Sequence, residues 1–371
     1  MRDRLKGTPD QLREAFLKLR SPRDVAELLD VRYDRLVYHI YVVPEAKRYT
    51  VFHIPKKSGG QREILAPATP LKLIQKKLNQ VLQAVYQPKP SAHGFLPARN
   101  IRTNAEPHAG KRYVLNIDLK DFFPSINFGR VRGLFLSKPY NLPDEVATVL
   151  AQIACYTHPE DTWQHNGKVV RRSYLPQGAP TSPIITNMIC AGMDAELQRL
   201  AKRCRATYTR YADDLTFSTT LRTFPEDLAQ VVDDTEGRKR VFLSETLRSI
   251  IEKHGFEVND KKVRLQDRRF RQEVTGLTVN EFPNVRRSFV RQVRAMLHAW
   301  DKYGLEQAER EYRVKYESKH RGPYHAAPSF AHIVRGKLEF IGMVKGKGDP
   351  VYLKYLGHYY SLIERDKLAS K

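Results

Sequence analysis

A pair of adjacent aspartates, Asp213 and Asp214, stands between two alternating runs and constrains the fold more than any other feature. Residues 206–211 and 214–218 alternate polar with apolar side chains, which predicts two strands joined as a hairpin. Aspartate is poor inside strands, and such local violations tend to mark functional sites. Taken alone, Asp-Asp is also an ordinary turn dipeptide. The sequence therefore predicts a hairpin with an acidic tip.

A third acid, Asp118, ends an apolar strand predicted at residues 113–118. Alternation places Val114, Asn116 and Asp118 on one face of that strand. Two carboxylates ~4 Å apart repel by ~4 kcal/mol at an effective dielectric of ~20, so a divalent cation is the natural remedy. One carboxylate from this strand and two from the hairpin can hold two Mg²⁺ ions. Such a site supports in-line phosphoryl displacement.

The charge of the chain narrows the class of substrate. Its 371 residues include 64 Lys+Arg against 41 Asp+Glu, a formal net charge of +23. Nucleic acid is the favoured partner for this excess; an acidic membrane surface is the weaker option, since no single basic amphipathic helix dominates. Beside an acidic metal site, the charge indicates synthesis or cleavage of polynucleotides.

Composition and patterning exclude several other classes of protein. The longest apolar stretch, residues 146–156, is shorter than the ~20 residues that a membrane-spanning helix needs, so no membrane association is expected. The charged N-terminus carries no export signal. Three scattered cysteines form neither a disulfide framework nor a zinc site, which predicts a cytoplasmic protein.

Helices and strands are expected in an irregular order. Helices are expected over residues 1–35, 71–86, 142–156, 183–202 and 241–254. Strands are expected within residues 37–54, around a basic glycine turn at 56–62, and over residues 113–118, 206–218 and 274–279. Without a regular βαβ alternation, this order predicts an α+β fold with an antiparallel sheet.

Four motifs in order resemble those of reverse transcriptases. Residues 211–214, Tyr-Ala-Asp-Asp, resemble the catalytic box, and residues 116–125 resemble the first catalytic strand. Residues 175–183 are similar to the substrate-binding loop, and residues 254–262 match the motif that follows. Order and spacing agree over residues 36–282.

Two shorter segments narrow the resemblance to bacterial retron reverse transcriptases. Residues 104–108 resemble the Asn-Ala-x-x-His signature of that family, and residues 274–276 its Val-Thr-Gly signature. The resemblance implies a right-hand polymerase with an antiparallel palm sheet. Its implied parts are an N-terminal helical extension (1–35), fingers (36–110), a palm with a fingers insertion (111–282) and an RNA-binding helical thumb (283–371).

The same resemblance implies roles for individual residues. Asp118, Asp213 and Asp214 become the catalytic acids and the ligands of two Mg²⁺ ions. Phe123 matches the steric gate that excludes a ribose 2′-hydroxyl, and is equally compatible with a core aromatic. The other implied nucleotide-binding residues are Arg62, Lys56, Gln177, Gly178 and Lys262.

Each of these five residues also has a simpler interpretation. Arg62 and Lys56 would clamp the triphosphate, although basic residues in such a turn are otherwise solvated. Gln177 would contact the nucleotide and Gly178 would let backbone approach closely, although a plain turn before a helix also uses these residues. Lys262 matches a lysine proposed to aid pyrophosphate departure, and is otherwise a surface lysine.

RNA-binding residues are expected near the two signatures and in the C-terminal segment. Beyond residue 286 an apolar stripe and a basic stripe occupy opposite faces of a predicted helix, which suits a thumb helix against a duplex, or a solvated face. Asn104 and His108 are expected to hydrogen-bond and shape the RNA-facing surface, although a lone histidine is more often structural. The other candidates are Val274, Thr275, Gly276, Arg287, Arg291 and Arg294.

The resemblance implies RNA-directed DNA synthesis from dNTPs. A retron enzyme binds its own structured non-coding RNA, of msr-msd type, and primes from a guanosine 2′-hydroxyl. Its product is multicopy single-stranded DNA (msDNA) that stays bound. Such complexes serve in antiphage defence with a separate effector or toxin protein. The alternatives are a reverse transcriptase of a group II intron or diversity-generating element, or a mainly scaffolding RNA–DNA-binding component of an effector complex.

Overall fold

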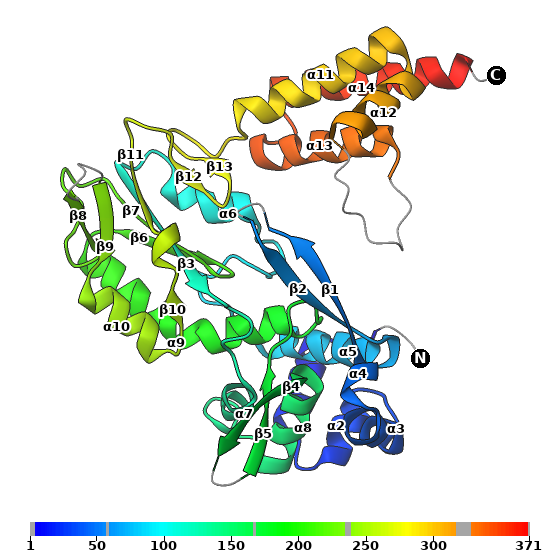
Figure 1. Ribbon diagram of the computed structural model, residues 1–371, viewed down its shortest axis with the longest axis vertical. Coiled ribbons are helices and arrows are strands. Elements are labelled where there is room, and N and C mark those ends of the chain that lie inside the picture. Colours follow the sequence, from blue (N-terminus) through cyan, green and yellow to red (C-terminus); the bar gives the residue numbers. More distant parts are fainter. Residues whose placement is uncertain (1–3, 57–58, 166–167, 234–238, 317–327, 370–371) are drawn as a thin grey trace. The chain divides into compact units, whose positions relative to one another are not determined.

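The computed structural model describes residues 4–56, 59–165, 168–233, 239–316 and 328–369 (Figure 1). The chain forms two compact units. The first unit comprises residues 1–100 and 115–265, and the second comprises residues 101–114 and 266–371. Each unit has a hydrophobic core of its own, so each is described separately.

The first unit begins with short helices. They are α1 (Pro9–Leu17), α2 (Pro22–Leu28), α3 (Tyr33–Val37), the π-helix η1 (Tyr38–Val42) and α4 (Glu45–Arg48). Capping boxes at Thr8 and Ser21, each followed by proline, begin α1 and α2. The expectation of strand within residues 37–54 was wrong up to residue 48. Leu36 and Ile40, four residues apart, are both buried, so helical spacing outweighs β propensity there.

A mixed set of elements follows in the first unit. They are the hairpin β1 (Tyr49–Pro55) and β2 (Gln61–Pro67), α5 (Thr69–Val85), α7 (Phe128–Leu136), α8 (Asp144–Ala154), the hairpin β4 (Tyr156–His165) and β5 (Lys168–Tyr174), the hairpin β8 (Ala229–Asp233) and β9 (Lys239–Leu243), and α10 (Glu245–Lys253). The helix expected from residue 241 begins later than predicted. Val241 pairs with Val231 in the β8–β9 hairpin, and the Ser244 side chain accepts a hydrogen bond from the Leu247 amide, which begins α10.

The central sheet of the first unit has the order β10-β3-β7-β6, with β11 (Arg264–Asp267) also on β3. Its other strands are β3 (Tyr113–Lys120), β6 (Thr207–Tyr211), β7 (Asp214–Thr219) and β10 (Glu257–Val258). The helix α9 (Ser182–Arg203) packs on β6, and α10 lies beside α9 (Figure 1). Tyr211 pairs with Asp214, so Ala212 and Asp213 form the hairpin turn, with Ala212 at φ 57°. The predicted hairpin is confirmed.

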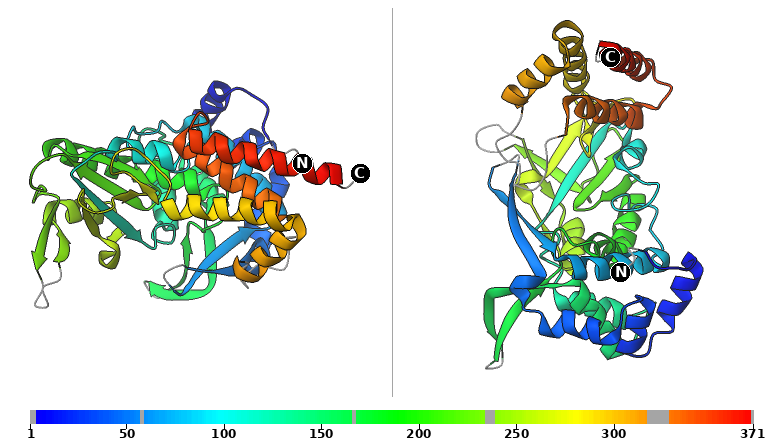
Figure 2. Two further views of the ribbon diagram at one scale, coloured as in Figure 1. Left: turned by 90° about the horizontal axis from the view of Figure 1, so that it is seen from above. Right: turned by 90° about the vertical axis from the view of Figure 1, so that its right-hand side faces the viewer.

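The second unit joins a small hairpin to a helical bundle. Its elements are α6 (Ile101–Ala105), η2 (Glu106–His108), β12 (Glu273–Val274), β13 (Leu277–Thr278), α11 (Arg287–Tyr303), α12 (Leu305–Tyr316), α13 (Phe330–Lys345) and α14 (Pro350–Ala369). Figure 2 shows α11, α13 and α14 side by side. The single strand expected at 274–279 is instead two short strands, because Thr275 and Gly276 adopt left-handed φ angles of 46° and 81°.

Helices and antiparallel hairpins thus combine in one chain, which confirms the α+β prediction. Cys155, Cys190 and Cys204 are free cysteines with buried side chains. Among the described helices, none is both long and apolar enough to cross a membrane.

Candidate active site

The structure brings together the three acids that the sequence singled out. Asp118 lies on β3 and Asp214 begins β7, and these strands are neighbours in the central sheet. The Leu119 amide donates a hydrogen bond of 3.1 Å to the Asp213 carbonyl. The Asp118 carboxylate acts electrostatically on both acids of the turn. Residues about a hundred positions apart thus form one acidic cluster.

The cluster carries more negative charge than its surroundings neutralise. Burial raises the pKa of Asp213, and the nearby Asp118 carboxylate raises it further. Burial, followed by repulsion from Asp213 and Asp118, raises the pKa of Asp214 to about 7. A cation beside Asp213 and Asp214 would favour their ionised forms and oppose both shifts.

Lys262 supplies part of the missing positive charge. It ends the 3₁₀ turn η3 (Asp260–Lys262), and its Nζ lies 2.9 and 3.0 Å from the two carboxylate oxygens of Asp118. The Asn259 side chain donates a further hydrogen bond of 3.3 Å to the same carboxylate. Lys262, which the sequence predicts to act at the pyrophosphate, thus contacts the candidate catalytic acid Asp118.

The donor set fits magnesium in its chemistry. Mg²⁺ prefers oxygen ligands and binds through one or two carboxylates plus substrate phosphates. Asp213 and Asp214 are half-buried carboxylates, and a divalent cation would relieve the repulsion between them. In the described part of the chain, no three His, Cys, Asp or Glu side chains are already arranged as a metal cluster. The three predicted ligands are therefore neighbours in the fold, but they are not arranged as a metal cluster.

The predicted nucleotide loop packs against β2. The Leu65 amide donates a hydrogen bond of 2.8 Å to the Gln177 carbonyl. Gly178 has φ +126°, and a Cβ there would lie 2.9 Å from the Leu65 carbonyl oxygen. Ser182 fixes the other side of the loop, because its hydroxyl donates to the Pro176 carbonyl at 2.7 Å. A side chain at position 178 would be strained, so glycine lets the loop pack closely against β2.

The remaining nucleotide candidates are Arg62, Lys56 and Phe123. Arg62 is exposed on β2 opposite Ile54, and its positive charge opposes the rise in the pKa of Asp213 that burial causes. Lys56 is exposed, and its amide donates to the Gly60 carbonyl within the hairpin turn. Phe123 is half-buried at the edge of the core, so it is available to a ligand.

Sequence reasoning missed a segment that adjoins the acidic turn, residues 91–95. The Ser91 carbonyl accepts a hydrogen bond from the Arg210 amide at 2.7 Å, and the Arg210 carbonyl accepts from the His93 amide at 2.8 Å. A Cβ on Gly94 would lie 2.6 Å from the Ala212 nitrogen. The Phe95 ring lies 6.2 Å from that of Phe123. The sequence signal that could have found this segment was the pair Gly94–Phe95, which lies outside every predicted helix and strand.

A buried ion pair beneath the turn was also missed. Arg210 and Asp194 are both 0% exposed, and two guanidinium nitrogens donate to the two carboxylate oxygens at 2.8 Å each. A third nitrogen of Arg210 donates to the Ala212 carbonyl at 3.1 Å, and the Tyr208 hydroxyl donates to Asp194 at 2.9 Å. The signal was a charged residue within a strand whose other side chains are threonines and tyrosines.

The two signature segments of the predicted RNA-binding set contact each other in the second unit. The Thr275 hydroxyl donates to the Ile101 carbonyl of α6 at 3.3 Å. Asn104, His108 and Val274 are fully buried, so their side chains do not face solvent. The Asn104 amide group has no hydrogen-bond partner among the described residues. Within the same set, Thr275 is half-buried and Gly276 is exposed.

The basic stripe lies on the solvent face of α11. Its exposed members are Arg287, Arg291, Arg294 and His298. On the opposite face Val293, Leu297 and Trp300 are buried in the core of the second unit, and the Trp300 indole donates to Asp366 of α14 at 2.7 Å. The predicted division of this helix into an apolar and a basic face is confirmed.

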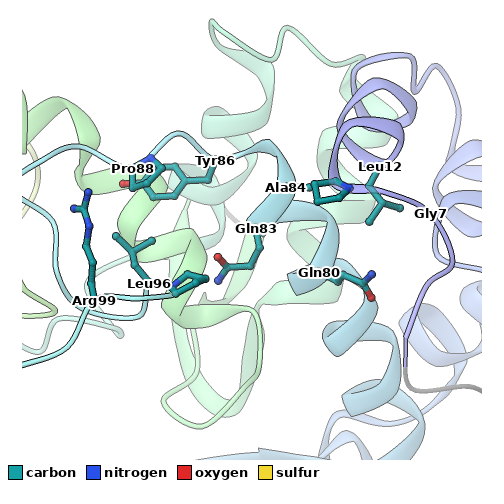
Figure 3. Close-up of a pocket in the computed structure, with 11 residues that line it drawn as sticks. Gly7, Leu12, Gln80, Gln83, Ala84, Tyr86, Pro88, Leu96 and Arg99 are labelled. Carbon is teal, nitrogen blue, oxygen red and sulfur yellow. The ribbon is translucent and has the colours of Figure 1, made fainter. Parts of the chain in front are cut away.

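A cavity of about 500 Å³ lies elsewhere in the first unit (Figure 3). It is bordered by α1, α5 and the segment that follows α5, and its lining includes Leu12, Gln83, Tyr86, Leu96 and Arg99. None of the predicted site residues lines this cavity. The acidic cluster, rather than the cavity, therefore carries the candidate chemistry.

Comparison with known proteins agrees with this geometry. Residues 54–279, more than half of the chain, match the family model described as reverse transcriptase (RNA-dependent DNA polymerase). The chain belongs to the reverse transcriptase family. The match spans β2, the acidic cluster and the nucleotide loop, and it ends just after the β12–β13 hairpin.

Curated proteins similar in sequence to this chain include several retron reverse transcriptases. The chain is 38% identical over 304 residues to the retron Mx65 reverse transcriptase of Myxococcus xanthus, covering 80% of this chain and 67% of that protein. It is 38% identical to the retron Mx162 enzyme of the same organism (76% and 59% covered) and 34% identical to the retron Ec86 enzyme of Escherichia coli (68% and 69%). These matches confirm the predicted retron branch of the family.

The chain spans 59–69% of the length of these three relatives. Among solved structures, a telomerase from Candida albicans in complex with a fragment of telomeric RNA aligns over 85% of this chain and 63% of that chain. The TM-score of that alignment is 0.43, at 11% identity.

Proposed function

We propose that the protein is a retron reverse transcriptase that copies part of its own structured non-coding RNA into msDNA, starting from a guanosine 2′-hydroxyl. The observation that carries the proposal is the meeting of Asp118, Asp213 and Asp214 on neighbouring strands of one sheet, in a chain of the retron family. Clustered carboxylates suit the metal ions that accompany a nucleotide triphosphate.

The acids hold two Mg²⁺ ions, which when bound stabilise charge on the attacking and leaving oxygens. Arg62 and Lys56 bind the triphosphate of a dNTP, for which a guanidinium fork is well suited. Gln177 and the Gly178 backbone orient the nucleotide, and Phe123 excludes a 2′-hydroxyl by its bulk. Lys262, which contacts the Asp118 carboxylate, would place its positive charge near the departing pyrophosphate.

The RNA is bound by electrostatics and by a recognition module. The net charge of +23 and the exposed stripe of α11 supply phosphate contacts. Asn104 and His108 act from the core of the second unit. The Thr275 hydroxyl ties α6 to the hairpin whose tip exposes Gly276. In the resulting hand, residues 36–110 are fingers, 111–282 palm and 283–371 thumb.

In the cell, the RNA–DNA complex serves antiphage defence together with a separate effector protein. This part of the proposal rests on the retron relatives alone. Deletion of the gene removes protection against phage, whereas a phage phenotype unchanged by deletion would contradict it.

The enzymatic part is tested by the nucleic acid that copurifies with the protein. After RNase and debranching treatment, the wild type yields one discrete DNA that was 2′-linked to RNA. Asp213→Asn abolishes that product, because the variant removes one charge from the acidic cluster. Asp121→Asn is the matched control: Asp121 is an exposed aspartate in the turn after β3 and should leave the product unchanged. Wild-type protein without such DNA, or an Asp213→Asn variant that still carries it, would refute the proposal.

A further inference from the structure

Phe123 is held in a short turn between β3 and α7. The Ser125 amide donates to the Asp121 carbonyl at 2.8 Å, and the Ile126 amide donates to the Phe123 carbonyl at 3.1 Å. The ring of Phe122 lies 5.5 Å from that of Phe123 at an interplanar angle of 69°. A ring that excludes a single hydroxyl by bulk discriminates only if it cannot move aside. What holds this turn therefore bears on sugar selection.

Arg130, on the first turns of α7, reaches back to the end of that turn. Its Nη1 donates to the Ser125 carbonyl at 3.1 Å and to the Gly255 carbonyl at 2.8 Å, and its Nη2 donates to the His254 carbonyl at 2.7 Å. Residues 254 and 255 follow the C-terminus of α10. One guanidinium thus ties the residue two positions after Phe123 to the end of a separate helix.

The same guanidinium also supports the rings behind Phe123. Its Cζ lies 4.4 Å from the centre of the Phe256 ring. Phe256 stacks on Phe122, with ring centres 5.5 Å apart and an interplanar angle of 27°. Phe122 is buried and contacts Phe123 edge-on. Arg130 therefore reaches Phe123 by two routes, through the backbone at Ser125 and through two stacked rings.

We propose that Arg130 is a positioning residue for Phe123, which it holds against the nucleotide sugar, and that it thereby sets the discrimination between dNTPs and NTPs. The inference rests on the proposed function, in which Phe123 excludes the 2′-hydroxyl. If Arg130 only capped the carbonyls at the end of α10, its substitution would lower stability without changing sugar discrimination.

The test is single-nucleotide incorporation on an RNA template, with dGTP and GTP as the competing substrates. Arg130→Gln removes the fork and should lower the ratio of kcat/KM for dGTP over GTP about tenfold, within the ~10²-fold that a 1 Å misplacement can cost. The change should come mainly from the KM values. Arg130→Lys keeps the charge but bonds fewer carbonyls, so its ratio should be intermediate.

Arg132→Gln is the matched control on the same helix. Arg132 also makes side-chain contacts, with Thr148 at 3.0 Å and with Asp144, but none of these leads to Phe123. The variant should keep the wild-type ratio. Thermal melts of each variant show whether it is folded, and Arg130→Lys carries the test if Arg130→Gln is not.

The route through Phe123 is tested by a double variant. If Arg130 acts through that ring, Arg130→Gln added to Phe123→Ala should not change the ratio further. An unchanged ratio in folded Arg130→Gln, or a further tenfold loss in the Phe123→Ala background, overturns the inference alone. Wild-type discrimination in Phe123→Ala overturns the gate and the inference with it, whereas a wild type that makes no DNA overturns the proposed function itself.

Discussion

The ion pair beneath the acidic turn is the contact whose loss should be felt most widely. Asp194→Asn keeps the shape of the side chain but removes its charge, which leaves the guanidinium of Arg210 buried without a counterion. The pair is 0% exposed on both sides, so no solvent screens the loss. The Tyr208 hydroxyl loses a charged acceptor at the same time.

The magnitude follows from the burial of both partners. Breaking a buried pair by removing one charge costs about 3–5 kcal/mol. Since 1 kcal/mol shifts Tm by about 2–4 °C in a domain of 150–250 residues, we expect Tm to fall by roughly 6–20 °C. Asp161→Asn is the control, because its pair with Arg172 is close to half exposed on both sides and should shift Tm by at most about 4 °C.

The assay is a thermal melt followed by circular dichroism, combined with DNA synthesis at a temperature where all variants are folded. Replacing both partners, as Asp194→Leu with Arg210→Met, should recover most of the stability, because apolar residues of similar size replace buried pairs well. That double variant still lacks the bond to the Ala212 carbonyl, so it should synthesise DNA more slowly than wild type. An Asp194→Asn variant as stable as Asp161→Asn would refute the reasoning.

Two further predictions concern the missed segment and the nucleotide loop. Burial, and then the charge of Arg99, lower the pKa of His93 to about 4. As pH falls, the imidazole is therefore protonated in the unfolded chain before it is protonated in the folded one. The resulting stability is complete above the ordinary pKa of about 6.5 and is lost as pH falls through about 4, up to ~3 kcal/mol. His93→Gln should flatten the decline in urea-unfolding free energy between pH 6.5 and 4, and parallel curves for the two proteins would contradict this. Gly178→Ala places a Cβ 2.9 Å from the Leu65 carbonyl at φ +126°, so it should raise the KM for dNTPs and lower Tm. Gly133→Ala, whose Cβ meets nothing within 4 Å, should do neither, and equal behaviour of the two variants would count against the close approach.

The periodic spacing of apolar residues predicted the helices and strands in which that spacing is regular. The helices at α5 and α9, the β6–β7 hairpin and the two faces of α11 lie where the sequence placed them. It failed at residues 37–48, where β-branched and aromatic residues adopt helical turns because Leu36 and Ile40 pack into the core. It also failed to foresee that Asn104 and His108 are buried, since a polar motif carries no local sign of its depth in the fold.

The order and spacing of the motifs along the chain sufficed to determine the family, because the acids, the nucleotide loop and the two signatures are each contiguous in sequence. The tertiary structure alone decided what holds them in place. Lys262 on Asp118, Asp194 on Arg210, residues 91–95 along the turn and Arg130 behind Phe123 are all pairings between segments distant in sequence. Such pairings depend on which surfaces are buried together, and burial is a property of the folded chain that a linear pattern does not encode.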